Sequence, residues 1–171
     1  MRHWRMMVTL SKYFLNLAQI VNKGMNKIER ALQRTGDTKS LIIGRGVVSR
    51  AAEMFIALFA GCKAIVVADE NTWNVAGGDV QKSLDDAGVI SENPFIFTAE
   101  DFYAEWRHIE SLKDYLGTRE VIAIAVGSGV INDIVKLVSN LLGRRYMCVG
   151  TAASMDGFTA YGASITKDGN K

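Results

Sequence analysis

From about residue 39 onward, short apolar runs alternate with longer amphipathic segments along the chain. The short runs predict buried strands at residues 41–43, 64–68, 95–97, 121–126 and 146–149. The segments between them predict helices at residues 47–60, 71–87, 99–116 and 131–142. A glycine follows most of these segments, which is a common way for a helix to end.

This alternation predicts the fold class. Strands that are apolar on both faces and separated by helices indicate a parallel sheet covered on two sides. We therefore predict an α/β domain with a Rossmann-like parallel sheet and helices on both faces. Right-handed crossovers bring the carboxyl ends of all strands to one edge, where ligands bind. The candidate functional residues are those directly after strands, at 44–46, 69, 127–129 and from 151 onward.

The two ends of the chain differ from this pattern. Apolar residues recur every three to four positions in the first segment, which predicts a helix, at Leu10, Phe14, Leu17, Val21, Ile28 and Ala31. We expect residues 1–38 to form a helical extension that docks on an α/β domain at 39–171; a partner surface is the alternative interpretation of the same stripe. Residues 158–166 predict a strand and 167–170 a hairpin turn without a partner strand, so we expect a truncated domain.

Composition excludes several classes of function. A formal net charge of +2 over 171 residues gives no basic footprint for nucleic acid or an anionic membrane. No apolar run approaches the length of a membrane span, so we expect a cytoplasmic protein. The two cysteines, Cys62 and Cys148, are too few for a disulfide framework. Their apolar sequence surroundings predict that both are small buried hydrophobic residues. Two histidines are too few for the common zinc sites, and His108 is expected in solvent.

The strongest candidate for ligand chemistry is the turn from Gly127 to Gly129. It follows the most apolar strand and opens a helix, where free backbone N–H groups and the helix dipole favour a phosphate. A plain tight turn between strand and helix remains the alternative. The turn is not a Walker loop, and Asn132 stands where a Rossmann motif has its third glycine.

Two further residue groups follow strands. Asp69 ends the second strand, where a carboxylate accepts hydrogen bonds from ribose hydroxyls and disfavours a 2′-phosphate; a helix N-cap is an equal alternative. Residues 151–157 follow the last strand, and their small side chains would let a flat ring approach closely. Asp156 in this stretch would project into the crevice, although an aspartate before glycine is commonly a turn residue.

Residues 127–136 and 151–157 together resemble glycerol-1-phosphate dehydrogenase, within the superfamily of iron-containing alcohol dehydrogenase, glycerol dehydrogenase and 3-dehydroquinate synthase. Residues 67–72 and 162–166 support the resemblance, which covers about residues 26–171. It implies a dehydroquinate synthase-like N-terminal domain that binds NAD(P). It also implies a helical metal-binding domain that is absent from this chain.

The resemblance assigns roles to individual residues. It implies that the pyrophosphate is held by Gly127, Ser128, Gly129, Val130 and Ile131, with Asp133 at the end of the same motif. Asp69 would hold the adenosine ribose and Asp156 would contact the substrate. The nicotinamide side would be lined by Thr151, Ala152, Ala153, Ser154 and Ala160. Two positions depart from the family: Gly150 replaces a proline, and Ala160 replaces a serine, which removes about one hydrogen bond, ~1 kcal/mol.

The implied activity is hydride transfer between NAD(P)H and dihydroxyacetone phosphate, a small-molecule substrate, giving glycerol 1-phosphate. A zinc, nickel or iron ion would polarise the ketone in the complete protein, with ligands beyond residue 171. We therefore expect this chain alone to be inactive, and the complete protein to be a homodimer or larger homo-oligomer. The alternatives are glycerol dehydrogenase or an iron-type alcohol dehydrogenase and, in another class, a non-catalytic nucleotide-binding or interaction module.

Overall fold

The computed structural model describes residues 37–98, 102–153 and 157–167, together with Ile28, Leu32, Met155, Gly169 and the backbone of 6–10. Its strands are β1 (Met6–Leu10), β2 (Thr38–Ile42), β3 (Lys63–Asp69), β4 (Phe95–Phe97), β5 (Val121–Gly127) and β6 (Tyr146–Gly150). Its helices are η1 (Val47–Arg50), α2 (Ala51–Phe59), α3 (Glu70–Thr72), η2 (Trp73–Gly77), α4 (Gly78–Asp86), α5 (Trp106–Gly117), α6 (Gly129–Leu141) and η3 (Gly157–Thr159).

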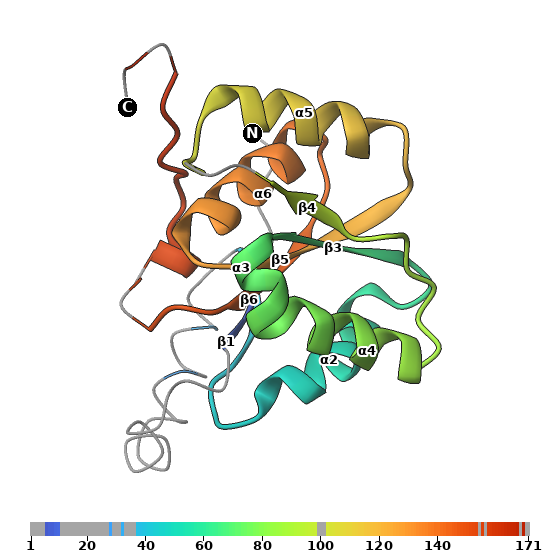
Figure 1. The fold of residues 1–171 in the computed structure, drawn as a ribbon. Helices are drawn as coiled ribbons and strands as arrows, with labels where there is room; N and C mark the ends of the chain where they lie inside the picture. Colours follow the sequence, from blue (N-terminus) through green and yellow to red (C-terminus); the bar gives the residue numbers. More distant parts are fainter. Residues whose placement is uncertain are drawn as a thin grey trace.

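The six strands form one sheet in the order β2-β1-β6-β5-β3-β4, and every neighbouring pair is parallel. Helices α5 and α6 cover one face of this sheet, and α2 and α4 cover the other (Figure 1). The predicted α/β fold with a parallel sheet and helices on both faces is confirmed. No helix in the described part of the chain is both long and apolar enough to cross a bilayer.

Side chains of the central strands alternate between two cores, because successive residues of a strand point to opposite faces. In β3, Ile65 and Val67 pack toward α5 and α6, whereas Val66 packs toward α2 and α4. Helix α6 presents a buried stripe at helical spacing to the first of these cores, at Ile131, Ile134, Val135 and Val138. The apolar runs of β3, β5 and β6 were therefore correctly interpreted as buried strands, whereas β2 and β4 are largely half-buried and β2 begins at Thr38, earlier than the predicted residue 41.

The predicted helices form with local differences. The segment expected as one helix at 71–87 is α3, a π-helical stretch and α4 in succession, and Gly88 with φ 69° follows its end. Helix α5 begins at Trp106, later than the expected start at residue 99, and residues 99–101 lie outside the described set.

The first segment differs from the prediction. Residues 6–10 form β1, which pairs with β2 and β6 inside the sheet, so this part of the expected helical extension is wrong. A five-residue apolar run does not distinguish a buried strand from a helical turn by its periodicity. Ile28 and Leu32 are helical, and the stripe positions Phe14, Leu17, Val21 and Ala31 lie outside the described residues.

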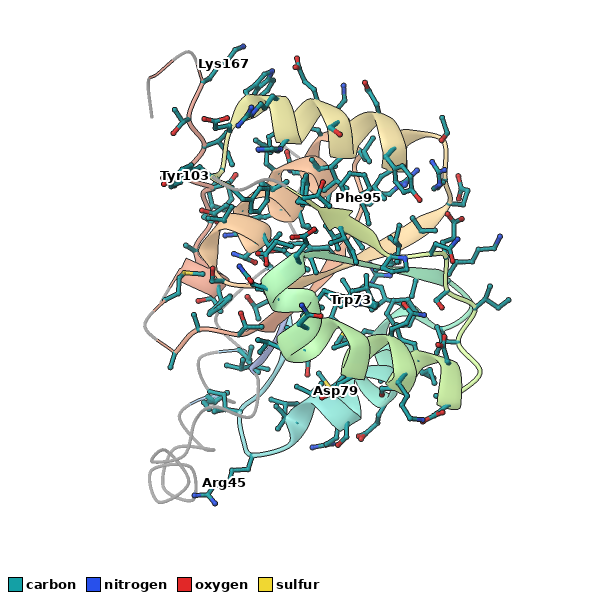
Figure 2. The ribbon with its side chains drawn as sticks, viewed as in Figure 1. Arg45, Trp73, Asp79, Phe95, Tyr103 and Lys167 are labelled. Atoms are coloured by element: carbon teal, nitrogen blue, oxygen red, sulfur yellow. The ribbon has the colours of Figure 1, made fainter. Side chains whose placement is uncertain are left out.

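The predicted strand at 158–166 is also wrong. The chain there forms η3 and then an irregular segment, which touches the loop before α5 through a single bridge between Thr166 and Glu105. The Thr166 amide donates to the carbonyl of Ala104 (2.7 Å), and Lys167, labelled in Figure 2, lies over the Trp106 ring, 4.5 Å from its centroid. Hydrogen bonds and side-chain contacts, rather than a strand partner, fix this segment.

Candidate functional site

The carboxyl ends of the central strands meet at one edge of the sheet. Gly127 of β5 pairs with Gly150 of β6, and Asp69 of β3 pairs with Phe97 of β4. Asp69 lies two residues beyond the pair of Val67 and Ala125, as Gly127 does on its own strand. The structure thus places Gly127 at the end of β5 and Asp69 at the end of β3 side by side on neighbouring strands.

The turn at Gly127 packs tightly against the helix that follows it. A β-carbon on Gly127 would lie 2.6 Å from Cβ of Ile131, so a side chain there would clash with α6. Gly127 is therefore required for the close packing of strand and helix. This observation supports the plain-turn interpretation of Gly127 and leaves the ligand interpretation to the residues after it.

The start of α6 offers backbone donors. Ser128 is the N-cap residue, but among the residues that the structure describes its side chain makes no capping hydrogen bond, and the first turn of α6 holds no acidic residue. The first intrahelical bond runs from the Asn132 amide to the Ser128 carbonyl (3.1 Å), so the N–H groups of Gly129, Val130 and Ile131 precede it. These uncapped donors and the helix dipole fit an anionic group such as a phosphate.

The chain after β6 folds back over this helix start. The Thr151 amide donates to the Gly127 carbonyl (3.0 Å), which ties the two turns together. Met155 lies against the start of α6, because a β-carbon on Gly129 would be 3.4 Å from its Cγ. Ala152 is half-buried and Ala153 is exposed. Ser154 and Asp156 lie outside the described residues, so their assigned contacts stay predictions.

Asp69 caps the helix after β3. Its Oδ1 accepts a hydrogen bond from the Thr72 amide (2.8 Å), while the Thr72 hydroxyl accepts one from the Asp69 amide (3.0 Å). This capping box is the structural alternative that the sequence left open. It also holds the half-buried carboxylate at the sheet edge, so a second role toward a ribose stays a prediction.

Asp133 and Lys136 lie one turn apart on α6 and face the segment after β6. Lys136 is 1% exposed, and its Nζ donates to the carbonyls of Gly157 (3.3 Å) and Gly162 (3.0 Å) and to Oδ1 of Asp133 (3.4 Å). Oδ2 of Asp133 accepts from the Ser164 amide (3.0 Å). Both oxygens of Asp133 thus have partners within the chain, and Ala160 is exposed in the segment that they hold.

Sequence reasoning missed a buried polar pair behind the site. Asn132 of α6 is fully buried, and its Oδ1 accepts a hydrogen bond from the Tyr146 hydroxyl (3.2 Å). Burial raises the pKa of Tyr146 well above its usual value, and the nearby Cys148 and Asp133 raise it further. The pair joins α6 to β6, and nothing in the local sequence indicates that these two residues meet.

The cysteines and His108 differ in part from expectation. Cys148 is buried, as predicted, and burial raises the pKa of its thiol, whereas Cys62 is exposed because it lies in the loop before β3. His108 is half-buried rather than exposed to solvent. Its ring packs edge-on against Phe97 (5.4 Å between centroids) and Phe102 (5.0 Å), Nε2 is buried without a hydrogen-bond partner among the described residues, and burial lowers its pKa.

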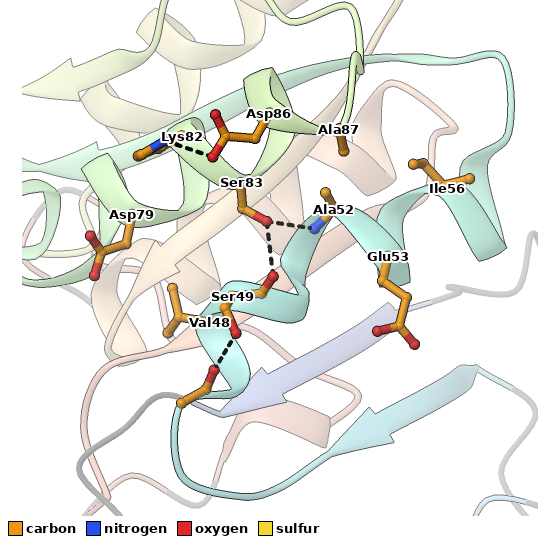
Figure 3. A pocket seen from close by; sticks show the side chains of 11 residues that line it. Val48, Ser49, Ala52, Glu53, Ile56, Asp79, Lys82, Ser83, Asp86 and Ala87 are labelled. Atoms are coloured by element: carbon orange, nitrogen blue, oxygen red, sulfur yellow. Dashed lines mark hydrogen bonds and ion pairs between the residues drawn. The ribbon is translucent and has the colours of Figure 1, made fainter.

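The surface has hollows between helices and beside the start of α6. A groove of about 690 Å³ runs between α2 and α4, where the Ser83 hydroxyl accepts from the Ala52 amide (3.3 Å) and donates to the Ser49 carbonyl (3.2 Å; Figure 3). A pocket of about 300 Å³ lies beside the start of α6, where Tyr103 and Ser164 flank Asp133. Across the residues that the structure describes, no three His, Cys, Asp or Glu side chains gather as a metal-ligand set.

Solved structures contain the same fold. The crystal structure of glycerol dehydrogenase from Schizosaccharomyces pombe matches with a TM-score of 0.57 at 22% identity, over 68% of this chain and 28% of that chain. At this identity the likeness supports the fold alone. It agrees with the parallel sheet and two helical layers described above.

Sequence comparison gives the family. Glycerol-1-phosphate dehydrogenase [NAD(P)+] of Methanococcoides burtonii is 34% identical over 77% of this chain and 35% of its own length. The enzyme of the same name from Halalkalibacterium halodurans is 33% identical over 62% of this chain and 27% of its own length. The chain thus spans about a third of these relatives. The model of the iron-containing alcohol dehydrogenases matches residues 42–171, and the chain belongs to this family.

Proposed function

We propose that this chain is the nucleotide-binding part of an NAD(P)-dependent, metal-dependent dehydrogenase. One observation carries the proposal: the uncapped start of α6 lies at the carboxyl edge of the sheet, beside Asp69 on the neighbouring strand. Ligands of open α/β sheets bind at this edge, and a pyrophosphate suits a helix start without an acidic cap. Membership of an oxidoreductase family supports the same conclusion.

The proposed substrate is dihydroxyacetone phosphate, reduced by NAD(P)H to sn-glycerol 1-phosphate. The curated relatives that carry the name glycerol-1-phosphate dehydrogenase [NAD(P)+] support it. Glycerol dehydrogenase activity differs only by the phosphate of the substrate, so a direct comparison of the two substrates distinguishes the two activities.

This chain's residues would bind and orient the cofactor. The N–H groups of Gly129, Val130 and Ile131 would donate to the pyrophosphate, and Asp69 would accept from the adenosine ribose. The nicotinamide supplies the hydride when it is bound. Small side chains at residues 151–153 would let its flat ring lie against the backbone after β6, and Asp156 would accept a hydrogen bond from a substrate hydroxyl.

Stabilising the developing alkoxide requires a positive centre. The described residues offer no metal-ligand set, so they do not fit a zinc, nickel or iron ion. We propose that its ligands come from residues outside 1–171 and that residues 1–171 alone do not turn over. The test is NADH oxidation with dihydroxyacetone phosphate and added zinc or nickel, by residues 1–171 and by a longer protein that contains them. Equal rates would contradict this assignment.

Cofactor binding is tested separately by titrating residues 1–171 with NADH and following nicotinamide fluorescence. We expect saturable binding that Gly129→Val abolishes, because its branched side chain would push against Met155 and crowd the backbone donors at the start of α6. Unchanged NADH affinity in this variant would refute the assigned turn. With the longer protein, oxidation of glycerol 1-phosphate in preference to glycerol is expected, and the reverse preference would favour glycerol dehydrogenase.

A further inference from the structure

The ammonium of Lys136 is unusual because it is buried yet fully satisfied. Its three protons match three acceptors: the carbonyls of Gly157 and Gly162 and one oxygen of Asp133. Two of these acceptors belong to a segment more than twenty residues away in sequence. Lys136 thus connects the middle of α6 to the chain that follows β6.

Asp133 extends this connection to a third backbone group. Its Oδ1 accepts from Lys136, and its Oδ2 accepts from the amide of Ser164 (3.0 Å). The two side chains therefore hold backbone groups at 157, 162 and 164 from one face of α6. We call Asp133, Lys136 and these three backbone groups the α6 clamp.

Packing alone does not explain a charged residue here. Removing an ammonium from water is costly, and an apolar side chain of similar length would fill the same space at lower cost. What the ammonium adds is a directional hold on two carbonyl groups. We therefore attribute to the α6 clamp the positioning of residues 157–164 rather than the packing of the core.

The clamped segment lies next to the start of α6. Met155, just before it, packs against Gly129, and the Gly157 amide lies 3.1 Å from the sulfur of Met155. Within the segment, the Ala160 amide donates to the Gly157 carbonyl (3.1 Å), which is also an acceptor of Lys136. Movement at Gly157 would therefore shift both Met155 and Ala160.

We propose that Lys136 and Asp133 are positioning residues that hold residues 157–164 beside the nicotinamide end of the cofactor and leave the ADP-ribose end unaffected. The inference rests on the proposed function, which assigns Ala160 to the nicotinamide side and Gly129 to the pyrophosphate. In this proposal Lys136 and Asp133 need no contact with the cofactor, because their polar atoms have partners within the chain. Both act through the backbone that they hold.

The test uses Lys136→Met and Asp133→Asn in residues 1–171, with Lys82→Met as the matched control. Lys82 also pairs with an aspartate of its own helix, Asp86 (2.6 Å), but the pair is exposed on α4. Three quantities are measured: NADH affinity, affinity for ADP-ribose, which lacks nicotinamide, and hydrogen exchange of the Ala160 and Ser164 amides without ligand.

For Lys136→Met we expect about tenfold faster exchange at Ala160 and Ser164, the order for losing one charged hydrogen bond. NADH affinity should fall by a similar factor while ADP-ribose affinity stays within about twofold. Asp133→Asn keeps an oxygen for Ser164 and should show smaller changes of the same kind, and it carries the test if Lys136→Met does not fold. Lys82→Met should change none of the three quantities.

Two results would overturn the proposal: unchanged exchange in both clamp variants, or equal losses of NADH and ADP-ribose affinity. If the unmodified chain binds neither ligand, the proposed function fails. In that case hydrogen exchange still tests whether Lys136 and Asp133 fix residues 157–164, because this measurement needs no cofactor. Faster exchange supports the clamp and unchanged exchange refutes it.

Discussion

Gly127 and Ile131 approach each other so closely across the turn after β5 that a β-carbon on Gly127 would lie 2.6 Å from Cβ of Ile131. Gly129, two residues on, has ordinary space, with Met155 at 3.4 Å from the same hypothetical atom. The two glycines of one motif therefore have different roles. The first is required for packing, and the second leaves backbone accessible.

Substitution by alanine should separate these roles. Gly127→Ala should destabilise the domain by about 1–3 kcal/mol, because α6 must move away from β5. Gly129→Ala should leave the unfolding free energy within about 0.5 kcal/mol, the usual range for sites without such a conflict. Urea unfolding of both variants measures this difference. Equal destabilisation by the two variants would contradict it.

Much of the fold and part of the site could be predicted from local sequence. The strands of the sheet centre and the helices around them follow from apolar runs and helical spacing, since both patterns report burial directly. The turn at Gly127 was placed correctly for the same reason, because it joins the most apolar strand to the amphipathic α6.

Other features depend on contacts between distant residues. The β1 strand was missed because its apolar run continues into a stripe with helical spacing, and only its pairing with β2 and β6 distinguishes it. The segment after Gly157 was predicted as a strand that leads into a hairpin turn, but it forms η3 and an irregular segment. The side chains of Lys136 and Asp133, which hold it in another conformation, lie more than twenty residues earlier.

The two cysteines should differ in reactivity. Cys62 is exposed, whereas Cys148 is buried and its pKa is raised, so that little thiolate forms there. We expect one thiol per folded chain to react quickly with Ellman's reagent and the second only after denaturation. Cys62→Ser should abolish the fast reaction. A fast phase that persists in this variant would show that β6 opens readily.

His108 should make the domain less stable in acid. Burial lowers its pKa in the folded state, with Arg107 adding to the effect and Glu105 opposing it. The unfolded chain therefore binds a proton at His108 more readily than the folded chain does. The contribution of neutral His108 to the free energy of unfolding is fully present above the unfolded pKa of about 6.5 and is lost as the pH falls below it.

His108→Phe tests this effect, because a phenylalanine can pack with Phe97 and Phe102 but does not titrate. Between pH 7.5 and 5.5 the Tm of the unmodified domain should fall further than that of the variant by about 1–3 °C, an effect of the size that fractions of 1 kcal/mol produce in such a domain. Parallel Tm curves for the two proteins would show that protonation of His108 is not linked to folding.

Asp69 caps a helix, and a single substitution can separate this role from the one that we propose for it toward the cofactor. Its carboxylate caps the helix after β3 through Thr72, and we propose that its charge disfavours the 2′-phosphate of NADP. Asp69→Asn keeps an oxygen for the Thr72 amide but removes the charge. The ratio of NADP to NAD affinity should therefore rise, by about tenfold for a loss of ~1.4 kcal/mol of repulsion.

Thr72→Val is the matched control. It removes the hydroxyl that accepts from the Asp69 amide, should cost about 0.5–1.5 kcal/mol of stability, and should leave the ratio of NADP to NAD affinity unchanged. Fluorescence titration of the three proteins with NADH and NADPH measures both affinities. If the ratio of NADP to NAD affinity changed equally in both variants, the capping box, rather than the charge of Asp69, would determine the preference between the two cofactors.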